Sequence, residues 1–88
     1  MSYNYQTEKP FLFTERGQVA FLAIRDNVHK LLSSAGAVRM QEAYRVNSGA
    51  GTSWQELACV DRLVELGEIR EITQGDVAGQ HRVFVSVI

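Results

Sequence analysis

The chain has 88 residues, 45% of them hydrophobic, and its nine Lys and Arg against ten Asp and Glu residues give a net charge of −1. This length suits one small domain with a modest core. No apolar run approaches the roughly 20 residues that a membrane span requires, and the N-terminus lacks the basic and apolar regions of a signal peptide. Cys59 is the single cysteine, so we expect a cytoplasmic protein without an internal disulfide.

The charges are unevenly distributed along the chain. Residues 14–48 hold five basic and three acidic side chains, whereas residues 53–71 hold two basic and five acidic ones. A dedicated nucleic-acid binder usually carries a basic face, because neutralising phosphates supplies most of its nonspecific affinity. The near-neutral total therefore argues against strong nonspecific binding to nucleic acid.

Residues 1–13 read as an N-terminal arm ahead of a domain over residues 14–88. The arm contains four aromatic residues around Pro10, although disordered tails are usually poor in aromatics. We expect Phe11 and Phe13 either to pack on the core of their own domain or to belong to an arm exchanged between two subunits.

The first long helix is predicted over residues 15–35, because Thr14 is a favourable N-cap and Gly36 a favourable stop. Its apolar face, at about 100° per residue, consists of Ala20, Phe21, Ile24, Val28, Leu31, Leu32 and Ala35. Val19 and Leu22 lie on roughly the opposite face. We expect the N-terminal arm or a second subunit to cover this back of the helix.

A short extended link over residues 37–39 precedes a second, brief helix over residues 40–46. A third helix is predicted over residues 53–66. Its start fits a capping box, in which a hydroxyl and the side chain three residues later satisfy backbone N–H groups; Thr52 with Gln55 and Ser53 with Glu56 both fit. Gly67 stands where a helix usually ends.

A C-terminal β-hairpin is predicted over residues 68–87, with a Gly-containing loop over residues 74–80. In its second strand Val83, Val85 and Val87 alternate with Phe84 and Ser86, which is the period-two pattern of a half-buried strand. The expected fold class is therefore α+β, with three helices followed by a hairpin.

This order of elements resembles the winged helix-turn-helix superfamily, and the resemblance covers most of the chain. The segment LVELGEI at residues 63–69 is similar to the Leu-x-x-x-Gly-x-Ile/Leu junction between the third helix and the wing of many members. Members mostly place the third helix in the DNA major groove, while the wing touches the backbone or the minor groove. The resemblance thus implies a small DNA-binding transcription regulator.

Carried over by position, the resemblance implies two sets of DNA-binding residues. The third helix would present Ser53, Trp54, Gln55, Ala58 and Arg62. Arg39, Arg45 and Arg82 would contact phosphates. Gln55 and Arg62 suit adenine and guanine edges respectively. We expect a homodimer, since two half-sites raise the affinity of so weakly basic a chain.

The third helix departs from the family pattern because its outer side is acidic. As the alternative, the chain is a protein–protein interaction module that does not bind DNA and docks through Trp54 and an acidic face made of Asp61, Glu65, Glu68 and Glu71. Tryptophan is enriched at interaction hot spots. Trp54 could instead fold back against the second helix or the arm.

Neither a catalytic nor a metal site is evident in the sequence. His29, His81 and Cys59 match no familiar zinc spacing, and no motif would orient them for nucleophilic catalysis. The glycines before the third helix lack the strand and the lysine of a P-loop. We therefore expect no enzyme activity, no metal and no cofactor.

Overall fold

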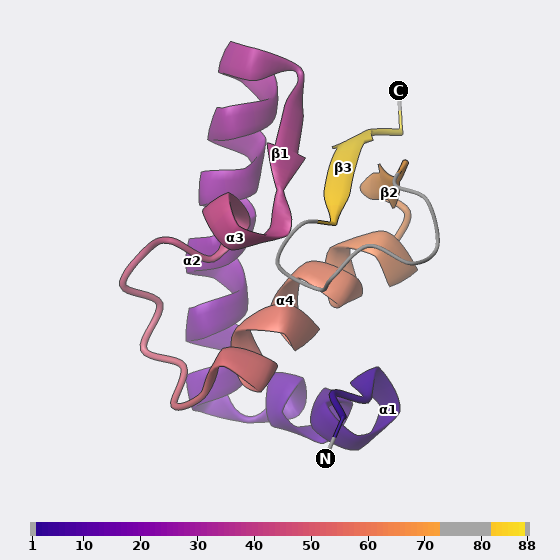
Figure 1. The fold of residues 1–88 in the computed structure, drawn as a ribbon. Helices are drawn as coiled ribbons and strands as arrows, with labels where there is room; N and C mark the ends of the chain where they lie inside the picture. The colour runs from indigo at the N-terminus through magenta and orange to yellow at the C-terminus, as the bar shows by residue number, and fades with distance from the viewer. Residues whose placement is uncertain (1, 73–81, 88) are drawn as a thin grey trace.

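The computed structural model describes residues 2–72 and 82–87. Its elements, coloured along the chain in Figure 1, are α1 (Tyr5–Glu8), the 3-10 helix η1 (Lys9–Phe13), α2 (Glu15–Ala35), β1 (Ala37–Arg39), α3 (Met40–Ala43), α4 (Ser53–Glu65), β2 (Ile69–Glu71) and β3 (Val83–Ser86). The described chain is thus a mixed α+β fold with four α-helices and one antiparallel sheet of three strands, ordered β1-β3-β2.

Helix α2 confirms the prediction for residues 15–35. The Thr14 hydroxyl accepts the Gly17 N–H, and Gly36 ends the helix at a φ of 81°. Of the predicted apolar face, the first four residues are buried and the two leucines are partly buried, but Ala35 is exposed because it lies in the last turn, beyond the core.

The expectation that the N-terminal arm covers the back of α2 is wrong; cover by a second subunit stays a prediction. Val19 keeps 60% of its surface and Leu22 keeps 50%. The arm packs instead against α4 and against the N-terminal part of α2 near Gly17, through α1 and η1.

Helix α3 is shorter than the predicted 40–46, since it ends at Ala43. The side-chain amide of Asn27 on α2 donates to the carbonyl oxygens of Glu42 and Ala43, at 3.0 and 2.9 Å. The Glu42 carbonyl oxygen also accepts the N–H of Arg45 at 3.2 Å, so one tight turn follows α3 in place of a further α-helical turn. The chain turns at Tyr44, so that the N–H of Val46 donates to the Tyr44 carbonyl.

Helix α4 runs directly into β2 through a glycine turn, as predicted. The N–H of Glu68 donates to the Leu63 carbonyl and the N–H of Gly67 to the Val64 carbonyl, each at 3.0 Å. This pair of bonds is the Schellman motif, and Gly67 adopts the positive φ of 79° that it requires. Because the turn is tight, Ile69 is buried one residue after the motif.

The two strands of the predicted hairpin pair in an antiparallel register that joins Arg70 to Val85 and Glu71 to Phe84. On its other edge β3 pairs with β1, with Val38 opposite Phe84. Residues 74–80, the predicted hairpin loop, lie outside the described residues.

The arm docks on its own domain through Leu12, which retains only 1% of its surface, and through the partly buried Phe11. Phe13 is 62% exposed, so its expected burial is wrong: the 3-10 turns of η1 direct Leu12, not Phe13, into the core. Gly17 makes this approach possible, since a Cβ there would overlap the carbonyl oxygen of Phe11.

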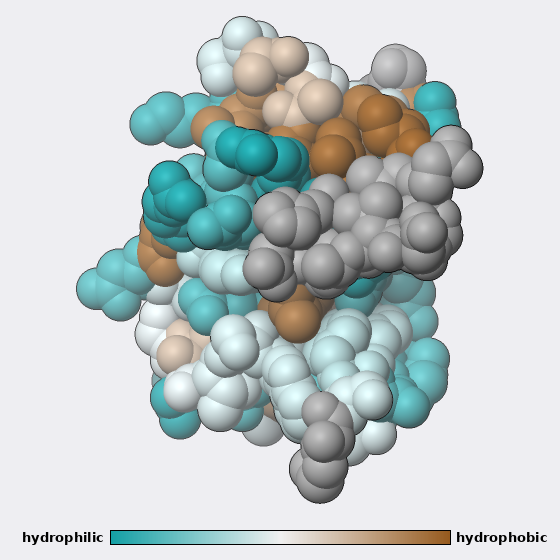
Figure 2. Space-filling model, viewed as in Figure 1, coloured by the Kyte–Doolittle hydropathy of each residue, from teal (hydrophilic) through white to brown (hydrophobic). Residues whose placement is uncertain are grey.

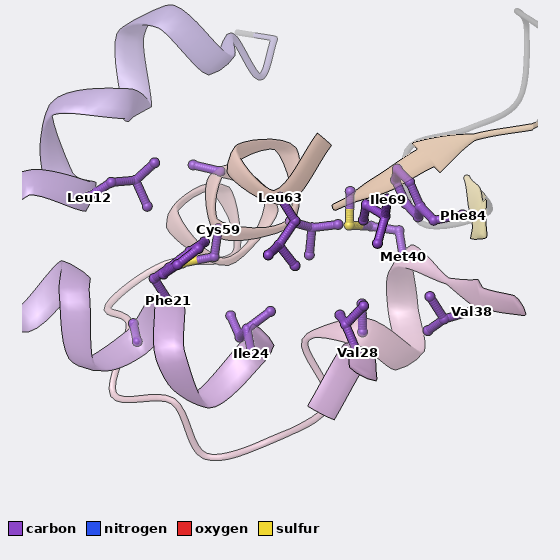
Figure 3. Close-up of a cluster of buried hydrophobic side chains, with 14 residues drawn as sticks. Leu12, Phe21, Ile24, Val28, Val38, Met40, Cys59, Leu63, Ile69 and Phe84 are labelled. Atoms are coloured by element: carbon purple, nitrogen blue, oxygen red, sulfur yellow. The ribbon is translucent and has the colours of Figure 1, made fainter. Parts of the chain in front are cut away.

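One hydrophobic core joins the helices to the inner face of the sheet. In Figure 3, Phe21 of α2 points toward Cys59 of α4, and Leu12 reaches in from the arm. Phe84 and Ile69 close the core at the sheet end.

Candidate nucleic-acid interface

The first turn of α4 contains three of the residues predicted to contact DNA, Ser53, Trp54 and Gln55. Thr52 is the N-cap, and its hydroxyl accepts the Gln55 N–H at 3.1 Å. The Gln55 side chain folds back to accept the N–H of Gly51 at 2.8 Å. Of the two pairs left open by the sequence, Thr52 with Gln55 thus begins the helix, but the return bond goes to Gly51, one residue before the N-cap, so the capping box is only half formed. Ser53 remains exposed.

Arg16, which is not among the residues predicted to contact DNA, also reaches this end of α4. Its guanidinium donates to the Gly49 carbonyl at 2.9 Å, and a Cβ on Gly51 would lie 2.7 Å from its Nη2. A cation beside the N-terminus of a helix adds to the positive end of the helix dipole. No local sequence signal could have paired Arg16 with a loop 33 positions away.

Arg62 lies on the outer side of α4, but its guanidinium is already engaged. It donates to the Glu65 carboxylate at 2.7 Å and lies 5.4 Å from the centre of the Phe13 ring. The hydrogen bond to Glu65 raises the pKa of Arg62. Ala58, one turn earlier on the same side, is fully buried and could not touch a DNA base.

The arm supplies the other partners of Glu65. Lys9 donates to this carboxylate at 2.8 Å and the Tyr5 hydroxyl at 2.7 Å. Hydrogen bonds from Lys9, Tyr5 and Arg62 lower the pKa of Glu65 to about 2. The N-terminal arm thus covers the outer side of the C-terminal half of α4.

Arg82 is held between two carboxylates. Its Nη2 lies 2.8 Å from Asp61 of α4 and 2.8 Å from Glu71 of β2. Burial alone would lower its pKa, but the hydrogen bonds to Glu71 and Asp61 outweigh burial and raise it. The Tyr3 hydroxyl donates to the same Asp61 at 2.6 Å. Arg82 therefore joins the arm, α4 and the sheet, and is not free to contact a phosphate.

Arg39 and Arg45 are the accessible cations of the predicted set. Arg39 forms an ion pair of 2.8 Å with Glu42, yet keeps 59% of its side chain exposed. Arg45 is exposed, and no hydrogen bond or ion pair of its side chain is present in the described part of the chain.

The acidic face proposed for protein docking is largely used within the chain. Asp61, Glu65 and Glu71 contact the arm or Arg82, as described above. Glu68 bonds to Arg25 and His29 of α2, each at 2.9 Å. Trp54 is half-buried and does not belong to the side chains packed on the core.

Cys59 is buried in the core, and burial, with a smaller effect of Glu56, raises the pKa of its thiol to about 12. Within residues 2–72 and 82–87 we find neither a group of His, Cys, Asp and Glu that could hold a metal ion nor a ligand pocket. Among the described helices we find none with an apolar stretch of the length that a membrane span needs.

Comparison with protein-family models, with curated proteins and with solved structures found no match for this chain.

Proposed function

We propose that this chain is a winged-helix DNA-binding protein that regulates transcription as a dimer. The observation that carries the proposal is the order and pairing of the elements. A long helix, a short strand, two further helices and two antiparallel strands follow one another, and the first strand completes the sheet beside the last. This order supports the winged-helix proposal, in which the helix before the hairpin would enter the major groove as the recognition helix of a helix-turn-helix does.

The N-terminal turn of α4 is the part of that helix best suited to contact DNA. Ser53 is exposed there, Arg16 lies beside it, and a helix N-terminus attracts phosphate. Arg45 and Arg39 add two accessible positive charges. To contact a base, the Arg62 guanidinium must first release the Glu65 carboxylate and the Phe13 ring.

Docking of a protein partner through Trp54 and the acidic face has less support. Each carboxylate of that face already has a cation within 3.0 Å: Asp61 and Glu71 have Arg82, Glu65 has Lys9 and Arg62, and Glu68 has Arg25. A basic partner would have to displace these groups.

A mobility-shift selection from a random-sequence DNA pool, at two salt concentrations and with light scattering on the same sample, tests the proposal. We expect a dimer to enrich one site in a salt-sensitive manner. Arg45→Ala should weaken binding to all sequences and reduce the salt slope by about one. Arg70→Ala, at an exposed arginine on the sheet, is the matched control and should bind normally. A folded protein that shifts no DNA at low salt would refute the proposal.

Within the same assay, Arg62→Ala decides whether the outer side of α4 takes part. If Arg62 contacts a base, the Arg62→Ala variant should lose about 1–3 kcal/mol of base preference at one position of the DNA site. An unchanged site preference would confine the DNA contact to the first turn of α4.

A further inference from the structure

The sheet has an inner face that closes the core and an outer face that no described element covers. Side chains alternate along a strand, so the buried Val38, Ile69 and Phe84 define the inner face. The opposite positions, here named the outer sheet face, are Ala37, Arg39, Arg70, Ile72, Val83, Val85 and Val87.

The centre of the outer sheet face is apolar. Val83 and Val85 are half-buried, and neither belongs to the core cluster or to the side chains packed against it. At its ends, Ile72 is 46% exposed and Val87 is 49% exposed. In Figure 2 brown atoms gather over the position of β3. Contiguous apolar surface of this kind, rimmed by polar groups, marks interaction sites.

Two arginines flank the apolar centre from opposite sides. Arg39 on β1 stands opposite Val83, and Arg70 on β2 stands opposite Val85. Arg70 is exposed and makes no hydrogen bond or ion pair within the described chain. The strand positions of this face include no carboxylate; Glu42, which pairs with Arg39, comes from α3. An occupant of the face should therefore be apolar in the middle and acidic on both sides.

The spacing of the arginines matches the width of a helix. Strands β1 and β2 are separated by two strand spacings, about 9.5 Å, and an α-helix with its side chains is about 10–12 Å wide. A second copy of this chain, stacked face to face, would bring arginines against arginines. DNA would leave the valines without an apolar partner. We propose that the outer sheet face binds an amphipathic helix of a partner protein, with its apolar stripe on Val83 and Val85 and with carboxylates beside Arg39 and Arg70.

A titration followed by amide NMR tests the proposal with two synthetic helical peptides of 18 residues. Both have leucines at one helical stripe; one has glutamates and the other lysines at the flanking positions. We expect the glutamate peptide to shift signals of residues 37–39, 69–72 and 83–87 in a salt-sensitive manner, and the lysine peptide to leave them unchanged.

Two variants localise the interaction. Arg70→Glu should weaken binding of the glutamate peptide about tenfold, because it places like charges together. Val85→Thr, a strand-forming residue of nearly the same shape, should weaken it by removing apolar contact. Arg45→Glu, which reverses a charge outside this face, is the matched control and should bind the peptide as wild type does.

Four results would overturn the proposal. The first is the absence of localised shifts at millimolar glutamate peptide, and the second is equal shifts with the lysine peptide. The third is a wild-type dimer that the Val85→Thr substitution dissociates. The fourth is a loss of DNA affinity in Arg70→Glu as large as that in Arg45→Glu. The third result would assign the face to a second copy and the fourth to DNA. The first two test peptide binding directly and leave the proposed DNA function untouched.

Discussion

Replacing Gly17 with alanine should destabilise the protein, although alanine is the better helix former. Gly17 lies in the first turn of α2, directly beneath the arm. A Cβ at this position would overlap the Phe11 carbonyl oxygen and lie 2.7 Å from the Phe11 carbonyl carbon and 2.9 Å from Leu12 Cα. All three are backbone atoms, so no side-chain rotation can relieve the clash.

One stabilising effect and two alternative destabilising effects set the expected change in the free energy of unfolding. Alanine contributes at most about 1 kcal/mol of helix propensity over glycine. Overpacking against a backbone costs about 1–3 kcal/mol. If the arm moves away instead, Leu12 loses its burial, which is worth about 1.5–3 kcal/mol. Subtracting the gain of about 1 kcal/mol from a cost of about 1.5–3 kcal/mol, we expect Gly17→Ala to lower the free energy of unfolding by about 0.5–2 kcal/mol.

Urea unfolding followed by the fluorescence of Trp54, the single tryptophan, measures the effect. Ser33→Ala, at an exposed position of the same helix, is the matched control for helix propensity and should be neutral or slightly stabilising. A Gly17→Ala protein as stable as wild type, or more stable, would mean that the Phe11–Leu12 backbone does not lie on α2.

Three further predictions concern the α4 helix and its partners. Glu65 has a folded-state pKa of about 2, below the usual 4.3 or so, and the stability this adds is complete above the usual pKa and is lost as the pH falls toward 2. Wild type should therefore lose more stability than Glu65→Gln between pH 5 and pH 2 in urea melts, and parallel losses would contradict the three hydrogen bonds to Glu65. The Cys59 thiol, with a pKa of about 12, should resist alkylation at pH 8 until denaturant is added, whereas fast labelling of the native protein would show that the thiol is accessible. Gly67→Ala should cost about 1–2 kcal/mol, because its φ of 79° strains any residue with a Cβ, and a neutral result would mean that the turn differs.

The arm contributes to the fold through polar groups as well as through Leu12. Tyr3, Tyr5 and Lys9 all donate to carboxylates of α4. Burial, and then the bond to Asp61, raises the pKa of Tyr3; burial, and then the bond to Glu65, raises that of Tyr5. Both phenols thus remain protonated donors over the ordinary pH range, and the arm stays attached to the acidic side of α4.

The sequence by itself determined the features that depend on neighbouring residues. The hydroxyls of Thr14 and Thr52 begin helices, and Gly36 and Gly67 end them, because capping groups and a positive φ act within one turn. The helical period likewise identified most of the buried side of α2.

Only the tertiary structure decided the features that depend on distant residues. Asn27 ends α3 from another helix, and the Phe11 backbone requires a glycine at position 17. The contact of Arg62 with Phe13 and the ion pairs of Arg82 with Asp61 and Glu71 could not be read from the spacing of charges, because such contacts depend on distance in space rather than on separation along the chain. The same long-range pairing leaves Arg45 and Arg70 accessible to other molecules.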